Sequence, residues 1–124
     1  MYRYLAILCL CLTGCASVPE AYWQINRATS ERFTYVTDFE KHGVGHYDEP
    51  NVTGESMFSG DCEEAASAMK YQLAKIGVPS TRWVITTSNG LHAITCTHDG
   101  WCLDINTVPT RRENVFGTFL YEMP

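Results

Sequence analysis

Three residues of the chain, Cys62, His92 and Asp104, are of the types used together in thiol catalysis. A cysteine nucleophile needs a base that accepts its proton and a third group that orients the base. Cys62 lies in the stretch GDCEEAASAMKYQLAKIG, where Asp61 and Glu64 predict the capping box of a helix. The partial positive charge at a helix N-terminus favours a thiolate, so Cys62 is a candidate nucleophile, with a buried core residue and a disulfide partner as the alternatives.

The choice of base depends on the register of a predicted hairpin. The segments TRWVITT (81–87), LHAITC (91–96) and WCLDI (101–105) predict antiparallel strands joined by turns. If the second loop comprises residues 98–100, Cys96 faces Cys102, and His92 and Asp104 become diagonal neighbours on one face. A two-residue turn would shift every pair by one and point His92 and Asp104 to opposite faces. The catalytic interpretation therefore requires the three-residue loop, in which His98 is expected to be a solvated turn residue.

The first residues, MYRYLAILCLCLTGCAS, have the pattern of an export signal. Arg3 precedes an apolar run that is too short to span a bilayer and that ends in small residues. The sequence from Leu12 to Cys15 resembles the lipobox of bacterial lipoproteins, in which the cysteine becomes the acylated first residue after cleavage. We therefore expect residues 1–14 to be a signal peptide and Cys15 to carry a lipid that anchors residues 15–124 to the membrane. An ordinary signal peptide and an uncleaved anchor are the alternatives.

Three cysteines remain when residues 1–14 are removed and Cys15 is acylated: Cys62, Cys96 and Cys102. An odd number of cysteines in an oxidising compartment leaves at least one thiol without a partner. Cys96 and Cys102 face each other in the required register, either as a disulfide or as two reduced core residues. In both cases Cys62 is the thiol that is left over.

The elements that must position these residues indicate an α+β fold in one domain. A helical pattern runs from Pro19 to Gly43, with Thr29-Ser30 as an alternative break, and a loop follows over 43–60. The helix that begins at Asp61 is expected to end at Gly77. The strands then follow, the last over 115–122, and helices followed by antiparallel strands predict an α+β arrangement.

The charge of the chain narrows the range of partners. The formal net charge is −5 over 124 residues, and Arg111-Arg112 is the only basic run. This acidic balance argues against nucleic acid as a partner.

The blocks GDCEEAASAMKYQLAKIGVP, LHAI and WCLDIN together resemble the bacterial transglutaminase-like cysteine peptidases. These are small relatives of the papain and transglutaminase folds. The upstream segment INRATSERFTYVTDFEKHGVGHYDEP is similar to the leading helix and connecting loop of that family. By this resemblance Cys62 is the nucleophile, His92 the base and Asp104 the orienting acid of a papain/transglutaminase-like α+β fold.

The resemblance also implies a cofactor and a class of substrate. The best-known members are periplasmic, calcium-dependent proteases that trim large surface adhesins, and the acids that flank their cysteine help to hold calcium. That role would fall to Asp61, Glu63 and Glu64, and a bound cation would reverse the negative local field and favour the thiolate.

The expected protein is thus a thiol peptidase that is lipid-anchored in the bacterial cell envelope, on the periplasmic side of the outer membrane. It would hydrolyse an amide bond of a protein or peptide through an acyl-enzyme, although transfer to an amine uses the same intermediate. Two alternatives remain from the sequence. One is a non-catalytic envelope lipoprotein that uses the fold for binding or as a scaffold, and the other is an amide hydrolase that acts on cell-wall peptides.

Overall fold

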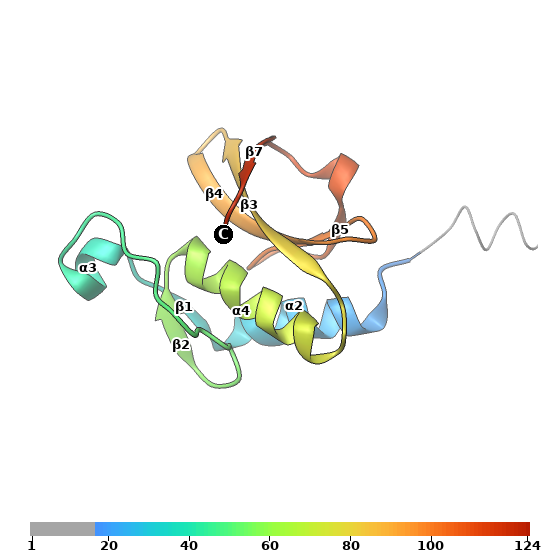
Figure 1. Cartoon of the computed structure of the whole chain (residues 1–124), viewed down its shortest axis with the longest axis horizontal. Coiled ribbons are helices and arrows are strands. Elements are labelled where there is room, and N and C mark those ends of the chain that lie inside the picture. The colour runs from blue at the N-terminus through green and yellow to red at the C-terminus, as the bar shows by residue number, and fades with distance from the viewer. Residues whose placement is uncertain (1–16) are drawn as a thin grey trace, which may run out of the picture.

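A computed structural model describes residues 17–124; the predicted signal and the predicted lipidation site Cys15 lie outside the described residues. Two longer helices and a short one alternate with short strands before a run of antiparallel strands (Figure 1). The elements in chain order are α2 (Glu20–Arg32), β1 (Phe33–Tyr35), α3 (Asp38–His42), β2 (Phe58–Gly60), α4 (Cys62–Lys75), β3 (Ser80–Thr87), β4 (Gly90–Thr97), β5 (Trp101–Leu103), β6 (Thr110–Arg111), the 3-10 turn η1 (Arg112–Asn114) and β7 (Thr118–Glu122). The predicted α+β class is confirmed.

The main sheet is antiparallel, with the strand order β6-β5-β4-β3-β7. The helices α2 and α4 lie on one side of this sheet in Figure 1. The buried residues Tyr22, Met69, Leu73, Trp101 and Leu103 form the core between the helices and the sheet. None of the helices within residues 17–124 is both long and apolar enough to cross a membrane.

A second, smaller core lies on the other face of the sheet. Side chains alternate between the two faces of a strand, so Ile94 and Cys96 point away from Thr95, whose hydroxyl donates to the Ala66 carbonyl in α4. Ile85 and Cys102 complete this buried cluster, and the segment that follows β6 packs against it through Val115 and Phe119.

The predicted register of the β4–β5 hairpin is confirmed. Cys96 pairs with Cys102, and Thr95 pairs with Leu103. Of the two states left open for Cys96 and Cys102, the structure contains the disulfide. Cys62 is the free cysteine of the described residues.

The prediction of one helix up to Gly43 was wrong, because α2 ends at Arg32; the alternative of two helices is confirmed, but the break follows Arg32 instead of lying at Thr29-Ser30. The run Phe33–Tyr35 is rich in residues that favour strands, and it pairs in parallel with β2. The rings of Phe33 and Phe58 pack 5.3 Å apart between these two strands. Helix α3 then begins at its own capping box, formed by Thr37 and Glu40.

Several strand boundaries also differ from the prediction. β5 ends at Leu103 instead of at residue 105, and the last strand begins at Thr118 instead of at residue 115. The two-residue strand β6 was not predicted, and β2 lies within the segment 43–60 that was predicted to be a loop. Short edge strands carry little periodicity, so their pattern alone does not reveal them.

Candidate active site

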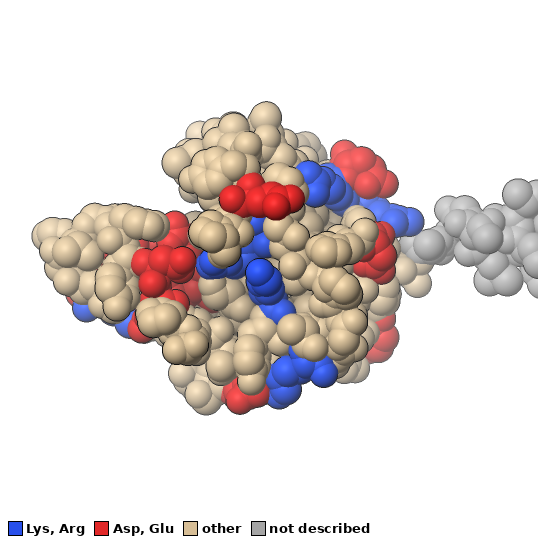
Figure 2. Space-filling view, viewed as in Figure 1, with Lys and Arg blue, Asp and Glu red and all other residues tan. Residues whose placement is uncertain are grey.

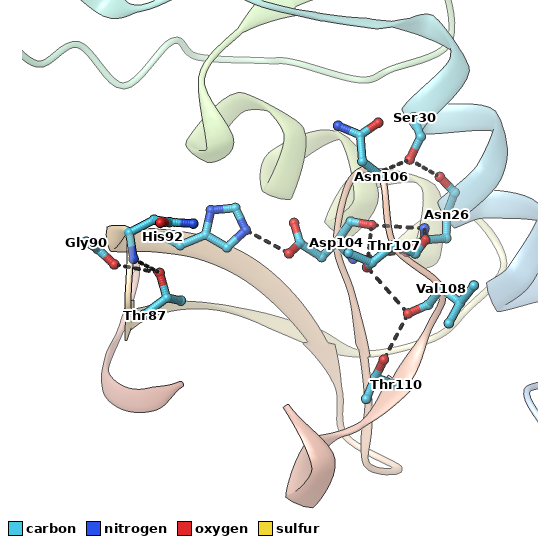
Figure 3. Close-up of polar contacts among 11 residues, drawn as sticks. Asn26, Ser30, Thr87, Gly90, His92, Asp104, Asn106, Thr107, Val108 and Thr110 are labelled. Carbon is cyan, nitrogen blue, oxygen red and sulfur yellow. Dashed lines mark hydrogen bonds and ion pairs between the residues drawn. The ribbon is translucent and has the colours of Figure 1, made fainter. Parts of the chain in front are cut away.

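His92 and Asp104 lie in direct contact. The Nε2 atom of His92 is 2.7 Å from Oδ2 of Asp104, and both side chains are half-buried (Figure 3). His92 comes from the middle of β4, and Asp104 follows directly after the last residue of β5. The hairpin therefore brings these two predicted site residues together at a distance typical of a charge-assisted hydrogen bond.

The end of β5 explains why the His92 ring and the Asp104 side chain can meet. The ladder between β4 and β5 stops at Thr95 and Leu103, so His92 lies beyond the paired part of that edge. Asp104 follows the end of β5, so no neighbouring strand of the described chain forms hydrogen bonds with its backbone. Instead, its N–H donates to Oδ1 of Asn26 at 2.9 Å, and Nδ2 of Asn26 donates to its carbonyl at 2.9 Å (Figure 3).

Asn26 is a residue that the sequence analysis missed. Its Nδ2 also donates to the carbonyl of Thr107 at 2.7 Å, and the residue is only 2% exposed. It lies on α2 four residues after Tyr22 and three before Thr29, both of them buried. A polar residue on the buried stripe of a helix was the available signal, because a buried amide needs partners. The pattern did not identify Asp104 as that partner.

Cys62 is the first residue of α4, and it is half-buried. The contact with Asp104, which is the largest cause, and then the nearby Cys62 side chain raise the pKa of His92 to about 10. Because Nε2 is engaged by Asp104, Nδ1 is the ring nitrogen left for the thiol. His92 is therefore an imidazolium at neutral pH, and its positive charge lies near the Cys62 side chain.

Tyr35 lies close enough to Cys62 for their charges to interact. Burial raises the pKa of the Tyr35 hydroxyl, and the negative charges of Cys62 and Asp61 raise that pKa further. Tyr35 ends β1, which pairs with the strand that leads into α4. The sequence analysis did not predict this neighbour, since it placed Tyr35 within a helix.

Of the three acids around Cys62, Asp61 and Glu64 form the predicted capping box. Asp61 accepts a hydrogen bond from the N–H of Glu63 at 2.9 Å, and the Glu64 carboxyl accepts one from the N–H of Asp61 at 3.1 Å. Burial, and then a hydrogen bond with Asp61, raises the pKa of Glu64 to about 8. Burial also raises the pKa of Glu63, with a further contribution from the charge of Asp61.

The predicted calcium ligands lie in two overlapping groups instead of one. Asp38, Asp61 and Glu64 bring one carboxylate oxygen each within 4.8 Å of one another, and Asp38, His46 and Glu63 form a second such group. Asp38 belongs to both groups, and the sequence analysis did not single it out. Figure 2 shows acidic side chains gathered where the segment around α3 meets the rest of the molecule.

This donor set fits a hard cation. Oε2 of Glu63 and Oε1 of Glu64 are buried and have no hydrogen-bond partner in the described part of the chain. Calcium binds carboxylate oxygens by preference, and Glu64 belongs to the group made of carboxylates alone, with Asp38 and Asp61. The group that could hold the cation includes Asp38, which lies 23 positions before Asp61 in the chain.

Two cavities lie near these elements. One, of about 260 Å³, has His92 and Asp104 in its wall. A larger one, of about 440 Å³, lies between the segment 48–52 and α4 and contains none of the predicted site residues. We assign greater functional weight to the smaller cavity, because it adjoins titratable groups whose geometry suits catalysis.

The comparisons with known proteins do not identify the chain. No protein-family model matches it, and a search of curated proteins finds no match either. The functional assignment therefore depends on the geometry of the site and on the sequence motifs.

Proposed function

We propose that the protein is a thiol peptidase of the papain/transglutaminase-like type, with Cys62 as nucleophile. The observation that carries the proposal is the 2.7 Å contact between His92 and Asp104, with the free Cys62 beside the same imidazole. Support also comes from the position of Cys62 at the N-terminus of a helix that packs on an antiparallel sheet. A nucleophile, its base and an orienting acid are the minimum set for acyl transfer.

In the first half of the reaction, the Cys62 thiolate attacks the carbonyl carbon of the substrate amide. A C–S bond forms, and the electron pair of the C=O bond moves to the oxygen. When this intermediate collapses, the C–N bond breaks and the His92 imidazolium gives its proton to the departing amine. The products of this half are a thioester on Cys62 and a free amine.

In the second half, neutral His92 takes a proton from a water molecule whose oxygen attacks the thioester. The C–S bond breaks, Cys62 leaves as a thiolate, and His92 is again an imidazolium. Asp104 holds the ring so that one nitrogen faces the thiol throughout both steps, and it stabilises the imidazolium. An amine in place of water would give amide transfer through the same steps.

The oxyanion requires hydrogen-bond donors near Cys62. The backbone N–H of Cys62 belongs to the first turn of α4, where N–H groups have no partner within the helix, and it supplies one donor. The Tyr35 hydroxyl is the second candidate donor, because the pKa of a tyrosine is already far above neutral pH and that of Tyr35 is raised further.

The proposal includes calcium as a cofactor and a lipid anchor. Asp38, Asp61 and Glu64 would hold the cation, and its positive charge would offset the acids that surround Cys62. The anchor rests on the sequence from Leu12 to Cys15 alone. We propose a protein or peptide substrate in the bacterial cell envelope.

The test is acylation of the protein by p-nitrophenyl acetate, followed by mass spectrometry of the intact chain and of its peptides. We expect an acetyl thioester on Cys62, faster than on an unfolded peptide, and its loss in Cys62→Ala and His92→Ala. Incubation with a peptide library should then show cleavage that depends on Cys62. If Cys62 is acylated and labelled by iodoacetamide no faster than an unfolded thiol, the protein is a scaffold. Cleavage restricted to cell-wall peptides would make it a cell-wall amide hydrolase.

A further inference from the structure

The cavity of about 260 Å³ beside His92 and Asp104 is formed on the sheet face that bears the disulfide. Its floor is made by Ile85, Ile94 and Cys102, and its opposite wall by Val115 and Phe116 from the segment between η1 and β7. Cys62 does not line it. The cavity thus adjoins the proposed base on the side that is not occupied by the nucleophile.

The lining presents apolar surface despite three threonines. Thr87, Thr107 and Thr110 each donate their hydroxyl hydrogen to a backbone carbonyl, so these donors are already used (Figure 3). His92 and Asp104 are the charged residues of the lining, and they compensate each other. A charged occupant would lose its hydration and would find the side-chain amide of Asn114 as the remaining polar partner, whereas an apolar occupant has no such hydration to lose.

Phe116 is an exposed apolar side chain at the cavity. Its side chain lines the cavity, yet the residue is 95% exposed, the largest exposed fraction among the large apolar residues of the described chain. Its backbone position is fixed by the next residue, Gly117, whose φ is +143° and where a Cβ atom would lie 2.7 Å from the carbonyl oxygen of Thr86. Only glycine allows this close approach, so the segment is held against β3 with Phe116 at the cavity.

The volume of the cavity indicates what kind of group it can bind. Pockets for drug-sized ligands and cofactors span about 300–1,000 Å³, and this cavity is below that range. It is large enough for one aromatic or branched aliphatic side chain. A single side chain of a peptide substrate therefore fits better than a separate small molecule.

The position of His92 indicates on which side of the scissile bond the substrate carries the side chain that enters the cavity. In the proposed function, on which this inference rests, the attacked carbonyl lies at Cys62 and the departing amine takes a proton from His92. The chain that follows the scissile bond must then pass His92 and reach the cavity wall. We propose that this cavity binds an apolar side chain on the leaving-amine side of the scissile bond.

Transfer of an acyl group to an added amine tests the leaving-amine side directly. The protein is first acetylated by p-nitrophenyl acetate, whose acyl group is too small to need the cavity. An amino acid amide then attacks the thioester, the C–N bond forms, the C–S bond breaks, Cys62 leaves as a thiolate and His92 takes the amine proton. The ratio of N-acetyl product to acetate measures how well each amine occupies the leaving side.

We expect phenylalaninamide and leucinamide to be acylated about tenfold more efficiently than glycinamide, the scale of selectivity of an apolar pocket. Phe116→Ala should remove most of that preference. The matched control, Leu120→Ala, also truncates an exposed apolar residue, but Leu120 does not line the cavity, so the preference should persist. Asn114→Asp places a carboxylate in the wall and should lower the preference as well.

The possible failures can be told apart. If the acetyl thioester forms but the amines are used equally, or if Phe116→Ala keeps the full preference, the subsite proposal is wrong and the peptidase proposal stands. If Cys62 forms no acetyl thioester, the proposed function fails, and the subsite assignment fails with it.

Discussion

The side-chain amide of Asn26 takes the place of a neighbouring strand for the backbone of Asp104. It accepts the N–H of Asp104 and donates to the carbonyl of the same residue, each at 2.9 Å. The two groups of a primary amide match the donor and acceptor that a strand would present. The carboxylate that contacts His92 is thus held in place by a helix distant in the chain, at the point where the sheet no longer supports it.

We predict that Asn26→Ala destabilises the protein by about 3 kcal/mol, because it removes three part-buried hydrogen bonds to the backbone of Asp104 and Thr107. It should also lower the pKa of His92, since the Asp104 carboxylate would no longer be held against the ring. Urea unfolding measures the first effect, and an NMR titration of the His92 ring measures the second. Gln24→Ala, an exposed position on the same helix, should change neither. An unchanged pKa of His92 in folded Asn26→Ala would show that Asn26 has only a structural role.

Asp104→Asn should keep the shape of the site and remove its charge. Because Asp104 is the largest cause of the raised pKa of His92, we expect that pKa to fall well below 10. Labelling of Cys62 by iodoacetamide at neutral pH should then slow by about tenfold or more, as the imidazolium is lost. Asp99→Asn, in the loop of the same hairpin, is the control. Equal labelling rates in Asp104→Asn and the wild type would exclude Asp104 from the catalytic set.

The stability of the protein should depend on pH through His92. The pKa of His92 is raised from 6.5 to about 10 on folding, so the folded state binds this proton more tightly than the unfolded state. The contribution of His92 is therefore fully present below pH 6.5 and is lost as the pH rises through 10. As the pH rises from 6.5 to above 10, the difference between the free energies of unfolding of the wild type and of His92→Gln should therefore shrink. His98→Gln, at an exposed histidine in the loop of the same hairpin, is the control for the loss of a histidine side chain.

Calcium should raise the melting temperature and the rate of Cys62 labelling, because a cation offsets the charge of the acids around the thiol. Asp38→Asn should weaken both responses, since Asp38 belongs to both acidic groups. Glu113→Gln, an exposed acid outside these groups, should retain both. A calcium titration that changes neither the melting temperature nor the labelling rate would leave Asp61 and Glu64 as a helix cap alone.

The disulfide between Cys96 and Cys102 should stabilise the hairpin that carries the site. It closes a loop of residues only six positions apart, for which the entropic model gives about 2 kcal/mol. The double variant Cys96→Ala and Cys102→Ala should lose about that amount in urea unfolding. Because the bond pins the register that places His92 beside Asp104, iodoacetamide labelling of Cys62 should slow too. Labelling at the wild-type rate would show that strand pairing alone maintains the register.

The sequence by itself determined the elements whose signals are local. The capping box of Asp61 and Glu64 located the start of α4, and the alternation of 91–96 and 101–105 limited the hairpin to two registers. The α+β class followed from these patterns, and the structure selected the one of the two registers that makes His92 and Asp104 neighbours. Local signals suffice here because capping and strand alternation depend on residues that are close in the chain.

Only the tertiary structure decided what depends on partners that are distant in the chain. The end of α2 at Arg32 was decided by β2, which lies more than twenty residues later and pairs with Phe33–Tyr35. The role of Asn26 required Asp104, and the regrouping of the acids required Asp38. A polar residue on a predicted buried face indicates that its amide or carboxylate needs a hydrogen-bond partner. The packing of the helices against the sheet determines which residue that partner is.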